Sequence, residues 1–398
     1  MNPLKRTDAM RCARLLLVFL FAPALPALAY EPATIAQLEQ MLTAEHGKSD
    51  KDLARQLSKL ELTERLSTLR FEKLQARLPG DKSRQALLVL SDISAFHNLS
   101  SAEIPQQPPP DRDTQSKILN KTTDYIRQTL PRLPNFIVSR NTARFENLKV
   151  DSVGGSVAVV EDQPYRFTNA IKETVTFRDG AEVQVKSAKR PELQRGLYNW
   201  GVFGPLLQIV VTDIFTGKMG WGHWEKNRMG TLAVFRYAVP QDRSHYHIKY
   251  CCFTTTNSWH MYEALPAYHG EIAIDPETGA NLRLTIQTEI PPGHPISRAD
   301  VLVEYSSVGI GGQEYICPTK SVSISRAMDT VKVREVHCAD FDCTPADLTH
   351  AQKISVNDTV YHSYHVFRSE IRILPAEASD AEGDSTQPAS SASTAPKH

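Results

Sequence analysis

The segment 268–325 has the sequence YHGEIAIDPETGANLRLTIQTEIPPGHPISRADVLVEYSSVGIGGQEYICPTKSVSIS and carries the clearest structural signal in the chain. Apolar and polar residues alternate in four parts of it, which turn-forming residues separate, notably Asp275–Gly279 and Gly309–Gly312. Successive side chains of a strand point to opposite faces, so this period of two predicts half-buried strands. We therefore expect an antiparallel meander with one dry face and one face in water.

The apolar positions of this meander predict its register. Leu282, Leu284 and Ile286 are expected on the dry face, whereas Arg283 between them is expected in water. The dry face is predicted to continue through Val301, Val303, Tyr305, Val322 and Ile324.

Residues 1–29 have the three parts of a secretory signal peptide. A basic start precedes the apolar run Leu15–Ala22, which is too short to span a bilayer, and Ala27-Leu28-Ala29 offers a cleavage site before Tyr30. We expect an exported protein, periplasmic or secreted. No integral membrane span is expected, because no later stretch approaches about 18 consecutive apolar residues.

The charge of the chain is balanced, with 45 basic and 45 acidic residues and a formal net charge of zero. Binding to nucleic acid depends on clustered basic residues, and the sequence shows no such cluster. Nucleic acid is therefore not expected as a partner.

The fold class predicted from these patterns is α+β. A small N-terminal helical bundle is followed by a curved antiparallel sheet domain packed on an apolar helix. Helix starts are expected at Thr34, at Ser49 or Asp50, at Thr63 and at Asp81. The predicted boundaries are a signal peptide 1–29, the bundle 30–104, a Pro-rich linker 105–113, a joining helix within 114–134, the β domain 135–374 and a disordered tail 375–398.

An apolar helix interrupts the β domain at about 205–217. Pro205 fits its first turn, and its apolar residues extend around much of its girth: Leu206, Ile209, Val210 and Ile214. A helix so apolar must be covered, and the dry face of the sheet is the expected cover.

Motifs for catalysis, phosphate binding, dinucleotide binding or zinc binding are not found in the sequence, so we assign no catalytic residue, metal ligand or cofactor. His223 and Glu225 have the chemistry of an acid–base pair, but no nucleophile is identifiable beside them. Trp221 and Trp224 flank them and either bind a ligand or cover a core.

Five cysteines follow the signal peptide. Cys338 and Cys343 are close in sequence in an exported chain, which predicts a disulfide between them. Two alternatives stay open for Cys251, Cys252 and Cys317: one of the adjacent pair bridges to Cys317, or all three are small core residues.

Three stretches carry a resemblance to a family of exported bacterial proteins that has no assigned activity. They are LTERLSTLRFEKL with LPG, then GHWE with LAVFRYAVP and SHYHIKY, and the back segment with YHGEIAIDPETGANLRLT, ADVLVEY and YICPTKSVSIS. The phrase GEIAIDPETGANLRL also resembles the periplasmic lipoprotein carriers. That resemblance implies a curved sheet closing over helices around an apolar cavity for acyl chains.

These observations favour an exported binding protein over an enzyme. In the first hypothesis the sheet and the apolar helix shelter a lipid or another apolar small molecule in a cavity. Its lining would be Leu206, Ile209, Val210, Ile214, Leu282, Leu284, Ile286, Trp221 and Trp224. The alternatives are a solid-core module that docks another envelope protein and a hydrolase whose site the sequence does not reveal.

Overall fold

The computed structural model describes residues 31–45, 47–150, 164–183, 196–197, 202–255, 258–331 and 349–367. The predicted signal peptide, the Cys338–Cys343 disulfide and the tail from residue 375 lie outside the described residues.

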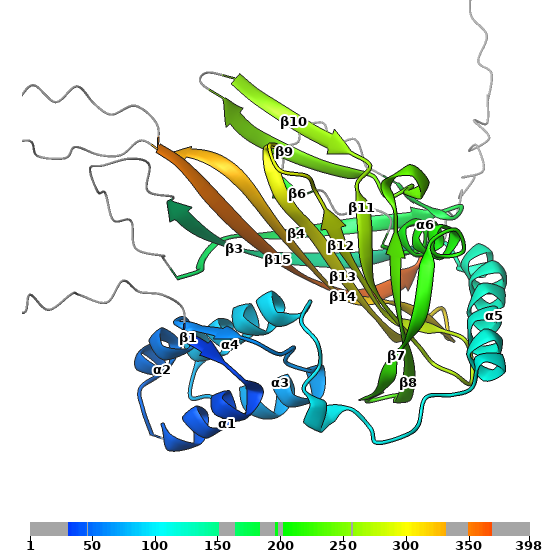
Figure 1. Ribbon diagram of the computed structural model, residues 1–398, viewed down its shortest axis with the longest axis horizontal. Helices are drawn as coiled ribbons and strands as arrows, with labels where there is room; N and C mark the ends of the chain where they lie inside the picture. Colours follow the sequence, from blue (N-terminus) through cyan, green and yellow to red (C-terminus); the bar gives the residue numbers. More distant parts are fainter. Residues whose placement is uncertain are drawn as a thin grey trace, which may run out of the picture.

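The protein is a mixed α+β structure, as predicted, and its largest element is a ten-stranded sheet with a strong twist (Figure 1). The strand order is β5-β4-β3-β15-β14-β13-β12-β11-β8-β7, and all neighbours are antiparallel. The strands are β3 (Phe136–Val150), β4 (Arg166–Arg178), β5 (Ala181–Val183), β7 (Lys218–Asn227), β8 (Gly230–Val239), β11 (Ala267–Ile274), β12 (Asn281–Glu289), β13 (Ile296–Ile310), β14 (Gln313–Val331) and β15 (Thr349–Val366). The predicted meander is confirmed as β11 to β14.

The tight turns form where the sequence places residues that tolerate positive φ. Asp179 and Gly180 have φ of 54° and 81° and join β4 to β5. Gly311 and Gly312, at 63° and 84°, join β13 to β14. Two consecutive residues with positive φ match the right-handed twist of the paired strands, so these hairpins close with two residues.

The N-terminal unit, residues 31–104, contains α1 (Ile35–Ala44), α2 (Asp50–Leu57), α3 (Thr68–Gln75), α4 (Asp81–Ser94), the 3-10 helix η1 (Ser101–Glu103) and a parallel pair of short strands, β1 (Glu31–Ala33) and β2 (Leu60–Leu62). Thr34 caps α1 in a capping box and Ser49 caps α2, as predicted. The helix expected to start at Thr63 begins instead after Ser67, which caps α3. Strand β2, immediately before Thr63, pairs with β1, so the chain is still extended there.

The remaining elements lie around the sheet. They are α5 (Arg112–Thr129), the 3-10 helices η2 (Leu130–Arg132) and η3 (Gln241–Arg243), the predicted apolar helix α6 (Pro205–Ile214), and a three-stranded sheet of β6 (Gly196–Leu197), β9 (Ile248–Thr255) and β10 (Ser258–Ala264). Within the described ranges, no helix combines the length and the apolar character needed to cross a bilayer.

The large sheet has two covered faces. On the face that we call the α6 face, Phe235, Ile272, Leu284 and Val303 pack in one core with Val210 of α6. We call the opposite side the N-terminal face. Figure 1 shows the N-terminal unit in blue beside the sheet, at the other end of the view from α5 and α6.

The N-terminal face is not in water, and this corrects the expectation of one wet face. Val322, Ile324 and Val356 pack there with Val89 of α4. Val322 and Ile324 were expected beside Val301 and Val303 but lie on the opposite face. Because both faces are covered, an apolar residue is buried whichever way it points, and alternation alone cannot assign its face.

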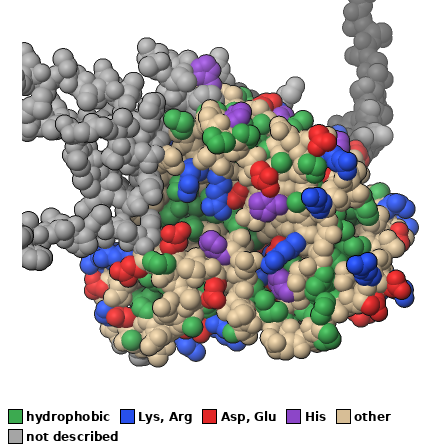
Figure 2. Space-filling model, in the orientation of Figure 1, with side chains coloured by type: hydrophobic (Ala, Val, Ile, Leu, Met, Phe, Trp, Pro, Cys, Tyr) green, Lys and Arg blue, Asp and Glu red, His purple; other side chains and the backbone are tan. Residues whose placement is uncertain are grey.

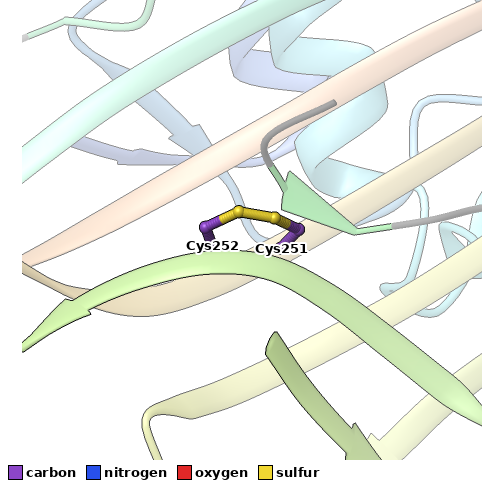
Figure 3. Close-up of a disulfide and its surroundings, with 2 residues drawn as sticks. All are labelled: Cys251 and Cys252. Carbon is purple, nitrogen blue, oxygen red and sulfur yellow. A yellow bond between two sulfur atoms is a disulfide. The ribbon is translucent and has the colours of Figure 1, made fainter. Parts of the chain in front are cut away.

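The cysteine arrangement differs from both alternatives left open by the sequence. Cys251 and Cys252 form a disulfide with each other within β9 (Figure 3), and Cys317 is a free, buried thiol. A bridge to Cys317 is therefore wrong. Burial raises the pKa of the Cys317 thiol to about 12, so it stays protonated at neutral pH.

Candidate functional site

A bulge in β7 determines which of its side chains meet the N-terminal unit. Trp221 pairs with Phe235 and His223 with Val234, which leaves Gly222 without a partner on β8. A Cβ at Gly222 would lie 2.9 Å from the backbone oxygen of Val234. The close approach of the two strands therefore requires glycine at this position.

The extra residue shifts the alternation by one. Trp221 and Trp224 consequently both lie on the α6 face, whereas His223 and Glu225 both lie on the N-terminal face, as their cross-strand pairs show. Both of the latter side chains are buried.

A second bulge, in β12, shifts Leu282 away from its predicted face. Ile274 pairs with Asn281 and Ala273 with Arg283, so Leu282 has no partner on β11. Leu282 packs with Ala273 on the N-terminal face, whereas Leu284 belongs to the core of the α6 face. The expectation that Leu282 and Leu284 share a face is therefore wrong.

Arg283 does project to the face opposite Leu284, as predicted, but it is not in water. Only 5% of the residue is exposed. Its guanidinium Nη2 lies 2.7 Å from Glu225 Oε2 and 3.2 Å from Glu271 Oε2. Glu225 Oε2 also accepts a hydrogen bond of 2.7 Å from Arg65 Nη2 of the N-terminal unit. We call these four residues the arginine–glutamate cluster.

The charges of this cluster are stabilised by one another. Burial favours the neutral acid, but Arg283 and Arg65 outweigh it and hold the pKa of Glu225 well below its ordinary value. The pKa of Glu271 is lowered in the same way, with burial opposing Arg283 and Arg65. Both carboxylates are thus ionised at neutral pH and occupied by arginines.

His223 and Glu225 do lie together, with His223 Nε2 3.5 Å from Glu225 Oε2. The carboxylate, however, is already engaged by two guanidinium groups. A carboxylate with a lowered pKa is a weak base, so Glu225 is poorly suited to act as the base of an acid–base pair with His223.

A pocket of about 300 Å³ opens beside the arginine–glutamate cluster, between residues 95–98 of the N-terminal unit and strands β8, β11 and β12. The polar residues that line it are His97, Asn98, Arg236, His269, Glu271, Arg283, Thr285 and Gln287. Figure 2 shows basic, acidic and histidine side chains interspersed over the face of the molecule seen there.

A hydrogen bond between Arg236 and Asn98 joins the two walls of the pocket, and further hydrogen bonds hold these residues within each wall. Arg236 Nη2 donates to Asn98 Oδ1 at 2.7 Å, and Arg236 Nε donates to Glu271 Oε1 at 3.2 Å. The backbone N–H of Arg65 donates to the carbonyl of Asn98 at 2.9 Å. Burial and the charge of Arg298 lower the pKa of His97, which keeps this imidazole neutral at pH 7.

The residues predicted to line an apolar cavity are mostly on the α6 face. Leu206, Val210, Ile214, Leu284 and Ile286 are buried in its core, and Ile209, Trp221 and Trp224 are partly buried against it. Leu282 is the exception, on the opposite face. The polar pocket and most of the residues predicted to line an apolar cavity therefore lie on opposite faces of one sheet.

The tryptophan pair packs into the structure around it. The rings of Trp221 and Trp224 are 4.9 Å apart in an edge-to-face arrangement, and the ring of Phe235 lies 5.4 Å from that of Trp221. Trp224 Nε1 donates to the carbonyl of Pro108 at 3.0 Å, which attaches the Pro-rich segment to β7.

A second ionic cluster joins α4 to the sheet, and we call it the lysine–aspartate cluster. Lys320 Nζ lies 2.7 Å from Asp92 Oδ1 and 3.2 Å from Asp358 Oδ1. Burial outweighs the attraction of Lys320 and raises the pKa of Asp92 to about 7. Two carboxylates thus share one cation at the domain contact.

A third polar group lies under α6. The buried carboxylate of Asp213 accepts hydrogen bonds from Tyr268 Oη at 2.7 Å and from the backbone N–H of His245 at 2.8 Å, and contacts His245 Nδ1 at 2.5 Å. The His245 side chain is 72% exposed. Within the described parts of the chain, no three His, Cys, Asp or Glu residues are grouped so that they could hold a metal ion.

No family model matches the chain, and no curated protein matches it. Among solved structures it is similar to a chain of the Pseudomonas aeruginosa MucA/MucB complex, with 12% identity, 62% of this chain and 93% of that chain covered, and a TM-score of 0.21. It is also similar to the InvG secretin domain of the Salmonella SPI-1 injectisome, with 5% identity, 61% and 64% covered, and a TM-score of 0.11. At such TM-scores neither likeness supports an argument about fold or function.

Proposed function

We propose that this protein is an exported, non-enzymatic binding protein of the cell envelope whose ligand occupies the polar pocket between the N-terminal unit and the sheet. The observation that carries the proposal is the pocket itself, whose walls come from two parts of the chain joined by the buried ion pair of Arg65 and Glu225. Ligand sites in proteins are commonly concave and lie where two such parts meet. Export and an envelope location rest on the signal sequence and on the resemblance to exported bacterial proteins.

Binding is favoured over hydrolysis by the state of the polar groups. Glu271 is held ionised by Arg283, so it is a weak general base. The hydroxyl of Thr285 accepts a hydrogen bond of 2.8 Å from the backbone N–H of Glu271, which fixes its position in the strand pair. The pocket is therefore built of fixed polar groups that position a ligand.

The lipid-carrier hypothesis remains the second candidate, because α6 is apolar and covers the α6 face. Val210 and Leu284 are both 0% exposed within one continuous cluster of buried side chains. Protein interiors are close-packed, so such a cluster favours a solid core over a lipid-sized cavity. A solid core also suits the docking of another envelope protein, which is the remaining non-enzymatic alternative.

Native mass spectrometry of protein isolated from its own cells tests the proposal, with two filling variants. Gln287→Trp fills the polar pocket, and Ile209→Trp fills the space under α6. We expect a co-purified small molecule in the parent and in Ile209→Trp but not in Gln287→Trp, with circular dichroism confirming that all three are folded. Loss of the bound mass only in Ile209→Trp would favour the lipid carrier, and a parent without bound mass would contradict the proposal.

A further inference from the structure

We infer that the polar pocket recognises an anionic group, a carboxylate or a phosphate, on its ligand. The inference rests on the proposed function and specifies the chemistry of the same site.

The charge of the lining favours an anion. Arg236 and Arg283 are cationic and Glu271 is anionic, so the charged lining residues carry a net charge of +1. Arg65 and Glu225 lie behind the lining and compensate each other at 2.7 Å. An anionic group entering the pocket would therefore balance an existing excess of positive charge.

The one carboxylate among the lining residues described, that of Glu271, is already in use. Glu271 accepts through Oε1 from Arg236 and through Oε2 from Arg283. A cation entering the pocket would have to compete with two guanidinium groups for this carboxylate. The arrangement thus disfavours a cationic ligand.

The donors, in contrast, are only partly used. Nε and Nη2 of Arg236 are engaged by Glu271 and Asn98, whereas no contact within the described residues engages Nη1, and the side chain is 55% exposed. Arg283 contributes positive charge to the lining, although its Nη1 and Nη2 groups are engaged by Glu271 and Glu225. Asn98 accepts through Oδ1, which leaves its amide nitrogen as a donor.

These donors have the geometry that oxyanions require. The planar guanidinium presents its N–H groups in a fork that matches two oxygens of a carboxylate or a phosphate. Of the two imidazoles of the lining, His97 adds a ring nitrogen that can donate to a further oxygen, whereas Nδ1 of His269 is engaged by Glu289 Oε1 at 3.0 Å. A phosphate, with more oxygens, would engage more of these donors than a carboxylate.

Isothermal titration calorimetry of the full-length exported chain tests the inference with four probes: inorganic phosphate, glycerol 3-phosphate, succinate and uncharged glycerol. We expect heat of binding with at least one anion and none with glycerol. If only the two phosphate probes bind, the recognised group is a phosphate. If only succinate binds, it is a carboxylate.

Two arginine variants make the test specific. Arg236→Gln removes a charge-assisted donor from the pocket and should weaken anion binding about tenfold or more. Arg228→Gln is the matched control, because Arg228, in the turn between β7 and β8, is also exposed and pairs with Glu72 of the N-terminal unit but does not line the pocket. Anion affinity should be unchanged in this variant.

The two proposals fail in different ways. If the co-purified ligand is neutral or cationic and is lost from Gln287→Trp, the binding function stands and the anion inference is overturned. If Arg236→Gln and Arg228→Gln weaken anion binding equally, the inference is also overturned, because the affinity would then depend on the overall surface charge and not on the pocket. If neither a co-purified molecule nor any probe binds, both proposals are wrong.

Discussion

The same strands of the large sheet supply side chains to two different kinds of contact, an apolar one on the α6 face and a polar one on the N-terminal face. On β12, Leu284 and Ile286 enter an apolar core under α6, while Arg283 and Thr285 enter a polar contact with the N-terminal unit. The α6 face is stabilised by the removal of apolar surface from water, and the N-terminal face is stabilised in part by matched charges. The first kind of contact holds a polar group such as Asp213 only where hydrogen bonds satisfy it, whereas the second leaves polar groups available to a ligand.

The largest effect is expected for Leu284→Asp on the α6 face. The residue is 0% exposed, and a carboxylate there would have no partner in the apolar core. We expect a loss of about 5 kcal/mol of unfolding free energy, or no soluble protein. Urea denaturation followed by tryptophan fluorescence measures it. A variant as stable as the parent would show that this face is not a core.

Arg283→Met on the N-terminal face should be nearly as damaging, although the alternation alone predicts a mild surface change. Glu271 would lose its buried guanidinium partner, and Glu225 would keep only Arg65. Breaking a buried ion pair costs about 3–5 kcal/mol. The double variant Arg283→Met with Glu271→Gln should recover part of the loss in the same denaturation assay. If the single variant costs less than about 1 kcal/mol, the cluster does not hold the two parts together.

The lysine–aspartate cluster predicts a dependence of stability on pH. The pKa of Asp92 is raised from about 4 in the unfolded chain to about 7 in the folded one. The folded state therefore binds this proton more tightly, so the stabilisation is complete below about pH 4 and is lost as pH rises through 7.

Between pH 5 and 8 this group should lower the unfolding free energy by roughly 2 kcal/mol. Thermal denaturation across this range tests it with Asp92→Asn, which should remove the dependence. Asp81→Asn is the control, because Asp81 is on the same helix but its side chain is fully exposed. A pH slope retained in Asp92→Asn would assign the effect to another group.

The smallest effect is expected for Trp224→Phe, which keeps the aromatic contact on the α6 face but removes the hydrogen bond to Pro108. A single neutral hydrogen bond contributes about 1 kcal/mol. Limited proteolysis should cut the segment 104–111 faster in this variant, with global stability almost unchanged. An unchanged cutting rate would mean that this bond does not restrain the segment.

Local sequence patterns were sufficient to predict the elements that form between residues close together in the sequence. The alternation and turn residues of the meander, the Asp179–Gly180 hairpin and the apolar helix starting at Pro205 were all predictable. Each depends on residues near one another in sequence, where dihedral preferences and periodicity act directly.

The pocket was not predictable for two physical reasons. Arg65 and Glu225 are 160 residues apart, and no local pattern indicates that a buried charge will find so distant a partner. The bulge at Gly222 shifts the alternation in β7 by one residue, and the bulge at Leu282 places Leu282 and Arg283 on the same face, so the period alone misassigns residues beside each bulge. Glycine within the strand pattern, at Gly220 and Gly222, was an available signal for a bulge.

The bulge at Gly222 also has a consequence for how this strand can change over time. A substitution in β7 alters one side chain. Deletion of Gly222 would instead shift the alternation by one residue, so that the residues from His223 to the end of β7 would point to the other face of the sheet. His223 and Glu225 would then enter the apolar core, and Trp224 would enter the charged contact. The placement of both groups therefore depends on one residue that has no side chain.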